Sequence, residues 1–251
     1  MPIELDIQGH AALITLNRPD KRNVLDLQAS RALADAVDAA LGAAAVRAVI
    51  VDSRGKAFCA GGSLDELLKA REEPELLQQI YAGFLAVLRC PLPTLALVQG
   101  LALGAGLNLA LACDMRVVAP QARFDTRFMQ LGIHCGGGHS WLLQRALGYE
   151  AASAALLLGQ TFDGEEAVIR GLALECVATE QLQARARALT EDLATVPREL
   201  LEASKASLLE AADGASHEAM LSREFERQTA SLRHPHAKRR LAEIRQLISS
   251  R

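Results

Sequence analysis

The amino-acid sequence predicts an α/β fold with a largely buried sheet, followed by a helical C-terminal region. Through the first half of the chain, apolar runs of strand length alternate with amphipathic stretches of helical length, which is typical of α/β proteins. After Gly136 the hydrophobic pattern becomes almost wholly helical. The 251 residues are 50% hydrophobic and 23% charged, so the chain is long and apolar enough to bury one large core.

The first half of the chain divides into elements by its hydrophobic period. Residues 1–17 alternate between apolar and polar positions, which predicts two short strands, and the charged sequence RPDKRN that follows predicts a turn. We expect Asp26 to cap a helix that ends near Leu41, because an aspartate side chain accepts hydrogen bonds from the first turn of a helix. The remaining elements are strands at 46–52, 94–98 and 115–119, and helices from Ser63, over 74–89 and from about Ala105.

The second half of the chain has a helical pattern. Asp163 and Glu166 have the spacing of a capping box, in which the two residues satisfy each other's backbone N–H groups. Amphipathic stretches predict helices over 179–195, 197–212, 216–232 and 235–249. No repeat or low-complexity linker interrupts the sequence. We therefore expect one continuous unit with a soft boundary, a core over 1–196 and a helical region over 197–251.

Composition argues against several classes of protein. A net charge of −3 and only nine aromatic residues give no general means of holding a nucleic acid. The five cysteines are odd in number and widely separated, which is typical of reduced thiols in an intracellular protein. The first ten residues carry two acids and no basic segment before an apolar run, so we expect no export signal and a cytoplasmic location.

The uncharged stretch from Cys90 to Cys113 is long enough to span a bilayer if it is helical. Two prolines and three glycines interrupt it, and its β-like TLALV sequence gives way to an Ala/Leu helical pattern. A buried strand that leads into a buried helix explains this composition and the glycines as well. We therefore predict no membrane span.

Two glycine-rich segments carry the clearest chemical signal. GKAFCAGGSLDEL, over 55–67, and QGLALGAGLNL, over 99–109, each follow an apolar strand and lead into a predicted helix. Ser63 and Glu66 have capping-box spacing, so the first helix is expected to begin there. Small residues at a helix start let a ligand approach free backbone N–H groups, which suits a carbonyl oxygen that becomes negative during a reaction. Each segment alone is also compatible with an ordinary strand-to-helix turn, and neither contains a dinucleotide or P-loop motif.

These residues resemble the crotonase, or enoyl-CoA hydratase/isomerase, superfamily. The resemblance covers most of the chain, through LNRPDKRNVLD, AFCAGGSLDEL, VQGLALGAGLNLALACDMRVVA, the GGG run, LLQRALG and DGEEAVIRGL. It implies a ββα spiral core with a helical C-terminal trimerisation region, assembled as a homotrimer or hexamer. It also implies an acyl-CoA substrate, with no cofactor beyond the coenzyme A moiety of that substrate.

The resemblance also assigns expected site residues. The thioester carbonyl would lie between the backbone N–H groups of Gly62 and Ala105, which would stabilise a thioester enolate. The channel for coenzyme A would be lined by Lys21, Arg22, Val24, Ala60 and Gly62. The basic RHPHAKRR segment near the C-terminus is either a further phosphate contact or the exposed start of the last helix.

The sequence departs from the family pattern where the catalytic carboxylates are expected. The three places hold Asn108, Phe128 and Gly136. Asn108 can hydrogen-bond to a water or a carbonyl but cannot carry a proton, whereas adding water to an enoyl thioester needs a proton donor and acceptor. His134 and His139, at the ends of HCGGGH, are the candidate substitutes, and alignment favours His134 at the acyl pocket. Two histidines and a cysteine without a fourth ligand do not predict a metal site.

The expected function is therefore that of an acyl-CoA thioester-processing enzyme, of the enoyl-CoA hydratase/isomerase type, that lacks the usual acids. One alternative is a histidine-assisted acyl-CoA hydrolase or decarboxylase. The other is a noncatalytic acyl-CoA-binding protein that has kept the pocket and lost the proton-transfer groups.

Overall fold

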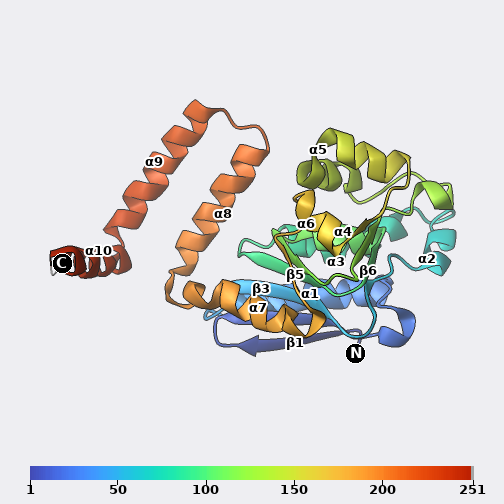
Figure 1. Cartoon of the computed structure of the whole chain (residues 1–251), viewed down its shortest axis with the longest axis horizontal. Coiled ribbons are helices and arrows are strands. Elements are labelled where there is room, and N and C mark those ends of the chain that lie inside the picture. The colour runs from blue at the N-terminus through green and yellow to red at the C-terminus, as the bar shows by residue number, and fades with distance from the viewer. Residues whose placement is uncertain (250–251) are drawn as a thin grey trace. The chain divides into compact units, whose positions relative to one another are not determined.

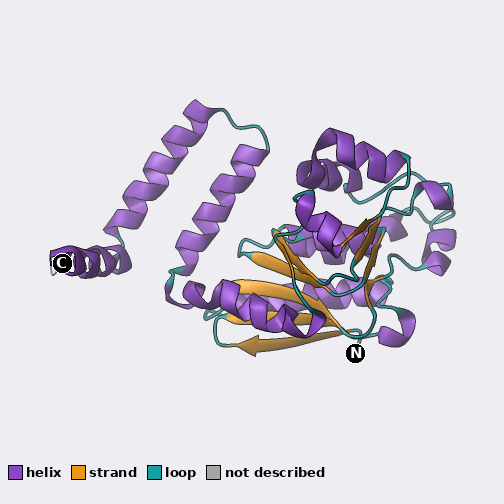
Figure 2. Ribbon diagram, viewed as in Figure 1, coloured by secondary structure: helices purple, strands orange, loops and turns teal. Residues whose placement is uncertain are grey.

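The computed structural model describes residues 1–249 and forms two compact units, Met1–Ala194 and Thr195–Arg251. The boundary expected from the sequence lies two residues further along the chain. The first unit holds all the strands, which form two sheets surrounded by helices (Figure 2). The second unit is helical.

The larger sheet is the centre of the first unit. Its β1 and β2 are antiparallel, and every other pair of neighbours is parallel. Every residue of β3 and β5 is buried, as expected of parallel strands that are covered on both faces. In spatial order the strands are β1 (Ile3–Gln8), β2 (Ala11–Leu16), β3 (Ala48–Ser53), β5 (Thr94–Val98), β7 (Met115–Val118) and β10 (Glu175–Cys176).

The smaller sheet consists of short strands that are not predictable from the sequence pattern. In spatial order they are β4 (Ala57–Cys59), β6 (Leu101–Leu103), β8 (Arg123–Asp125) and β9 (Phe162–Asp163). Three times the chain passes from the larger sheet to the smaller sheet and then into a helix. The three passages are β3–β4–α2 (Leu64–Lys69), β5–β6–α4 (Ala105–Ala112) and β7–β8–α5 (His139–Leu157). This is the ββα repeat that the resemblance implied.

The other helices of the first unit are α1 (Leu27–Gly42), α3 (Glu75–Leu88), α6 (Gly164–Ile169) and α7 (Leu182–Thr190). α1 and α3 pack against each other (Figure 1). The Ser30 hydroxyl joins them, because it accepts a hydrogen bond from the Gly83 N–H at 2.8 Å and donates one to the Ile80 carbonyl at 2.7 Å. A Cβ at position 83 would lie 2.7 Å from the Ser30 carbonyl oxygen, so only glycine permits this close approach.

Most of the elements predicted from the sequence are confirmed, with boundaries shifted by one or two residues. The Asp26 carboxylate caps α1 by accepting a hydrogen bond from the Ala29 N–H at 2.8 Å. The capping box of Asp163 and Glu166 is present at the start of α6. The uncharged stretch 90–113 forms β5, β6 and α4, and within residues 1–249 no helix is long and apolar enough to cross a membrane.

The second unit contains α8 (Arg198–Ala212), α9 (His217–Arg233) and α10 (Pro235–Ser249). Arg227 of α9 forms an ion pair with Glu210 of α8 at 2.7 Å, and Arg223 adds a second at 3.2 Å. Large apolar side chains are exposed along these helices, among them Leu208 at 72% and Phe225 at 69%.

Candidate functional site

The two glycine-rich turns lie against each other. Gly61 has a φ of 101°, and a Cβ built on it would lie 2.9 Å from the Leu103 carbonyl oxygen and 3.8 Å from the Ala105 nitrogen. A Cβ on Gly106 would lie only 2.1 Å from the Cys59 carbonyl oxygen. The glycines therefore allow the turn after β4 and the turn after β6 to approach at backbone distance. This contact brings Gly62 and Ala105, which are far apart in sequence, to one place.

The N–H groups of Gly62 and Ala105 are both available to a ligand. Gly62 forms an isolated parallel bridge with Leu25, in which the Leu25 N–H donates to the Gly61 carbonyl at 2.8 Å and the Ser63 N–H donates to the Leu25 carbonyl at 3.1 Å. This pattern leaves the Gly62 N–H outside the bridge. Ala105 is the first residue of α4, where an N–H has no acceptor within the helix. Among residues 1–249 neither N–H donates a hydrogen bond, and both residues are partly exposed.

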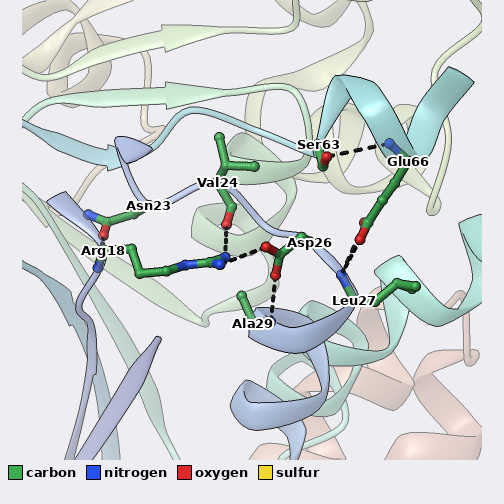
Figure 3. Close-up of polar contacts among 8 residues, drawn as sticks. All are labelled: Arg18, Asn23, Val24, Asp26, Leu27, Ala29, Ser63 and Glu66. Carbon is green, nitrogen blue, oxygen red and sulfur yellow. Dashed lines mark hydrogen bonds and ion pairs between the residues drawn. The ribbon is translucent and has the colours of Figure 1, made fainter. Parts of the chain in front are cut away.

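The capping box predicted for Ser63 and Glu66 is wrong in one half. The Ser63 hydroxyl does accept a hydrogen bond from the Glu66 N–H, at 3.4 Å (Figure 3). The Glu66 carboxylate instead accepts from the Leu27 N–H, at 3.0 and 3.1 Å. It cannot close the box because the Ser63 N–H is already bonded to Leu25. The Gly62 amide is therefore presented by the bridge to Leu25, and not by the first turn of the six-residue α2.

The residues expected along the coenzyme A channel lie on two segments, 21–24 and 60–62, that pair with each other. The Ala60 N–H donates to the Arg22 carbonyl at 3.0 Å, which extends the pairing of Gly62 with Leu25. Lys21 and Arg22 are exposed, whereas Val24, Ala60 and Gly62 are partly exposed. Arg22 follows the 3₁₀ turn Pro19–Lys21 with a left-handed φ of 51°. The structure thus brings all five predicted residues to one strip beside the turn at Gly62.

A side-chain clamp that the sequence did not predict fixes this strip (Figure 3). The Arg18 guanidinium donates to the Asp26 carboxylate at 2.6 Å and to the Val24 carbonyl at 2.7 Å. The buried Asn23 amide donates to the carbonyls of Arg54 and Ala57, each at 2.9 Å. Burial acts to raise the pKa of Asp26, but the hydrogen bonds from Arg18 and the Ala29 N–H outweigh it and lower that pKa. Asp26 therefore stays ionised and holds both Arg18 and the start of α1.

Asn108, one of the residues at a carboxylate position, pairs with His139. The Asn108 side-chain amide donates to the Gly136 carbonyl at 3.0 Å, so its oxygen faces His139, whose Nδ1 lies 2.6 Å away. An amide oxygen only accepts hydrogen bonds, so Nδ1 carries the imidazole proton and Nε2 has a free lone pair. Both side chains are buried, and Nε2 is one of two buried side-chain atoms of the described residues without a hydrogen-bond partner.

The other histidine candidate lies on the surface. His134 is exposed, and its Nδ1 lies 2.7 Å from the carbonyl oxygen of the adjacent Cys135. Phe128, the second residue at a carboxylate position, packs edge-on against His139 with ring centroids 4.8 Å apart. The positions of Asn108, Phe128 and Gly136 are thus gathered around His139, and not around the residue that alignment favoured. The signal in the sequence was the HCGGGH run, whose three glycines let the chain fold back onto α4.

Cys59 is the cysteine beside the Gly61 turn, and its thiol is buried. Burial raises the pKa of the Cys59 thiol, beside the Gly61 turn, to about 12, so it is protonated at neutral pH and is a poor nucleophile. Within the described part of the chain, no three His, Cys, Asp or Glu side chains gather in a group that would hold a metal ion.

Burial of His139 predicts a pH-dependent stability. Burial lowers the pKa of His139 from 6.5 to about 4, so between these values the unfolded chain takes up a proton that the native chain does not. The free energy of unfolding should therefore fall as the pH is lowered, and from pH 7 to pH 5 the loss due to this group is about 2 kcal/mol. Urea unfolding of the wild type and of His139→Gln at both pH values measures it. An equal loss in both proteins would assign the effect to other groups.

Comparison with known proteins agrees with this architecture. A model of the enoyl-CoA hydratase/isomerase family matches residues 6–243. The chain is 46% identical to a probable enoyl-CoA hydratase of Mycobacterium tuberculosis over 249 residues, which cover 96% of each protein. Its similarity extends to many solved structures, two of which follow. The first, an enoyl-CoA hydratase of Geobacillus kaustophilus, has a TM-score of 0.91 and 28% identity, with 98% of this chain and 95% of that chain covered.

The second structure is a putative enoyl-CoA hydratase of Thermobifida fusca in complex with acetoacetyl-CoA. It has a TM-score of 0.84 and 30% identity, with 92% of this chain and 94% of that chain covered. The match of the family model over nearly the whole chain, together with the ββα core, establishes the relationship. This chain belongs to the enoyl-CoA hydratase/isomerase family.

Proposed function

We propose that this protein binds an acyl-CoA thioester and stabilises its enolate between the N–H groups of Gly62 and Ala105. The observation that carries the proposal is the presence of these two unbonded amides on turns that touch through Gly61. Preorganised backbone donors lower the energy of an oxygen that gains negative charge, and each is worth about 3–4 kcal/mol in acyl-transfer enzymes. The complex of the Thermobifida fusca relative with acetoacetyl-CoA supports this class of ligand.

The coenzyme portion is proposed to run along Lys21, Arg22, Val24 and Ala60. The exposed cations Lys21 and Arg22 suit the nucleotide phosphates, and the pairing of Ala60 with Arg22 links this strip to the Gly62 amide. The helical second unit is proposed to assemble the chain into a homotrimer or hexamer. Its exposed apolar side chains support this, because a soluble monomer seldom leaves such a set uncovered.

For the reaction we propose enoyl-CoA hydratase/isomerase chemistry in which a neutral Asn108–His139 pair takes the place of the usual acids. A second candidate, thioester binding without turnover, is favoured by the absence of a carboxylate at Asn108 and Phe128. Hydration of crotonyl-CoA, followed by loss of enone absorbance, separates the two. A histidine-assisted hydrolase or decarboxylase would instead release free coenzyme A or carbon dioxide from acyl- or malonyl-CoA.

The enolate hypothesis has a direct spectroscopic test. Acetoacetyl-CoA enolises readily, and two N–H donors at its thioester oxygen should favour the absorbing enolate. We expect the enolate band to grow on addition of protein at neutral pH, to saturate with the binding isotherm, and to be absent with free coenzyme A or butyryl-CoA. Tight binding of acetoacetyl-CoA without any enolate band would contradict the proposed role of Gly62 and Ala105.

A further inference from the structure

The Nε2 atom of His139 is a buried hydrogen-bond acceptor that has no partner among the described residues. The Nδ1 atom of the same ring is bound to Asn108, which fixes the tautomer. Leaving a buried acceptor without a hydrogen bond destabilises a folded protein. A phenylalanine ring packed in the same place would have no unsatisfied acceptor, so the presence of histidine there points to a role in function.

This acceptor lies close to the proposed thioester site. Asn108 follows Ala105 by three residues on α4, which is one helical turn, or about 5 Å. The Phe128 ring reaches the same turn, because its Cζ lies 4.0 Å from where a Cβ of Gly104 would be. Phe128 and Asn108 both contact the His139 ring. The imidazole therefore lies beside the residues that present the Ala105 amide.

The chain is shaped to hold His139 in this position. A Cβ on Gly137 would lie 2.4 Å from the Phe84 ring and 3.2 Å from the Asn108 side-chain nitrogen. A Cβ on Gly136 would lie 2.2 Å from the Tyr81 hydroxyl. A side chain at either position would collide with Tyr81 or Phe84 of α3, and one at Gly137 would also crowd Asn108 of α4. The glycine run is thus what allows His139 to reach Asn108.

We propose that Nε2 of His139 accepts a hydrogen bond from a hydroxyl group on the third carbon of a bound acyl thioester, or from the water molecule that takes the same place. The inference rests on the proposed function, which puts the thioester carbonyl at Gly62 and Ala105. The third carbon lies only two bonds from the carbonyl carbon, so a carbonyl held at the start of α4 keeps its hydroxyl near the turn of the helix that carries Asn108, the partner of His139.

The chemistry of the pair supports an acceptor. Burial lowers the pKa of His139 to about 4, so the ring is neutral at pH 7 and Nε2 accepts a hydrogen bond there. Nε2 is closed to solvent, so a hydroxyl reaches it only when a neighbouring side chain shifts. Phe128 is the half-buried neighbour of the ring, and movement of its phenyl group would open this path.

Calorimetric binding of butyryl-CoA and of both enantiomers of 3-hydroxybutyryl-CoA tests the inference. We expect the wild type to bind one hydroxylated thioester about 10-fold more tightly than butyryl-CoA, since one added hydrogen bond is worth about 1 kcal/mol or slightly more. In His139→Phe this preference should fall to about 2-fold or less. His134→Phe, the same change at the exposed histidine, is the matched control and should keep the full preference.

A water-holding role has its own readout. If Nε2 holds the attacking water, His139→Phe should lower kcat for crotonyl-CoA hydration more than it changes KM, and His134→Phe should alter neither. Equal wild-type affinity for the plain and hydroxylated thioesters, with hydration unchanged in His139→Phe, would overturn the inference and leave the proposed function standing. Failure of the wild type to bind any of the thioesters would overturn the proposed function itself. Should His139→Phe fail to fold, the smaller His139→Leu gives the same comparison.

Discussion

Replacement of Ala105 by proline is expected to lower kcat/KM for thioester turnover by about 10²–10³-fold, because it removes one oxyanion donor. Proline lacks the backbone N–H, and it is favoured at the first position of a helix, which is where Ala105 lies in α4. The preceding residue, Gly104, has a φ of 50° and a ψ of −113° and no Cβ, so the proline ring meets no clash there. The variant should therefore lose the donor and keep the helix.

Crotonyl-CoA hydration and the enolate band of acetoacetyl-CoA both report on this change. Ala105→Ser is the matched control, since it also changes the side chain but retains the N–H, and it should stay within about 3-fold of the wild type for a partly exposed position. Circular dichroism verifies that α4 persists in the proline variant. A folded Ala105→Pro protein with an undiminished enolate band would show that this amide does not bind the thioester oxygen.

The sequence predicted best those helices and strands whose hydrophobic pattern lies within one short stretch of the chain. β5 and α4 follow from a continuous apolar run and an Ala/Leu pattern, and the cap of α1 follows from Asp26 alone. β4, β6 and β8 have only three residues each, too few to show a period. They exist because Leu101 pairs with both Ala57 and Arg123, contacts between segments that are far apart in sequence. No local pattern carries that information.

The site was predictable where backbone geometry depends on small residues, and it was not where a side chain is brought from a distance. The glycine-rich segments predicted free amides at two helix starts, the resemblance assigned them to Gly62 and Ala105, and the structure brings the two turns into contact. His139 lies 31 residues from Asn108 in sequence, and only the fold shows that it, and not His134, makes that contact. The Arg18 clamp was hidden for the same reason, since a charged turn in the sequence looks like a solvated one.

Replacement of Gly106 by alanine should lower the free energy of unfolding by about 3 kcal/mol, the upper end of the usual cost of overpacking a core. The new Cβ would lie 2.1 Å from the Cys59 carbonyl oxygen and 2.8 Å from the Cys59 Cβ, and a backbone atom cannot rotate aside as a side chain can. Helix propensity alone predicts the opposite sign, a gain of up to about 1 kcal/mol for alanine over glycine. A decrease in the free energy of unfolding would therefore be due to the contact between β4 and α4, whereas an increase would be due to helix propensity.

The same contact sets the distance between the two amides, so stability and function should change together at Gly106. To relieve the clash α4 must move away from β4, which carries the Ala105 N–H away from the Gly62 N–H. We expect the enolate band of acetoacetyl-CoA to weaken in Gly106→Ala even where urea unfolding, at a fixed protein concentration, shows the variant fully folded. Gly42→Ala is the control, because nothing lies within 4 Å of a Cβ at the end of α1; its enolate band should stay at the wild-type level and its stability should not fall. If Gly106→Ala were as stable as the wild type, the backbone at this contact could move apart without any loss of free energy. The contact would then not hold the two amides in place.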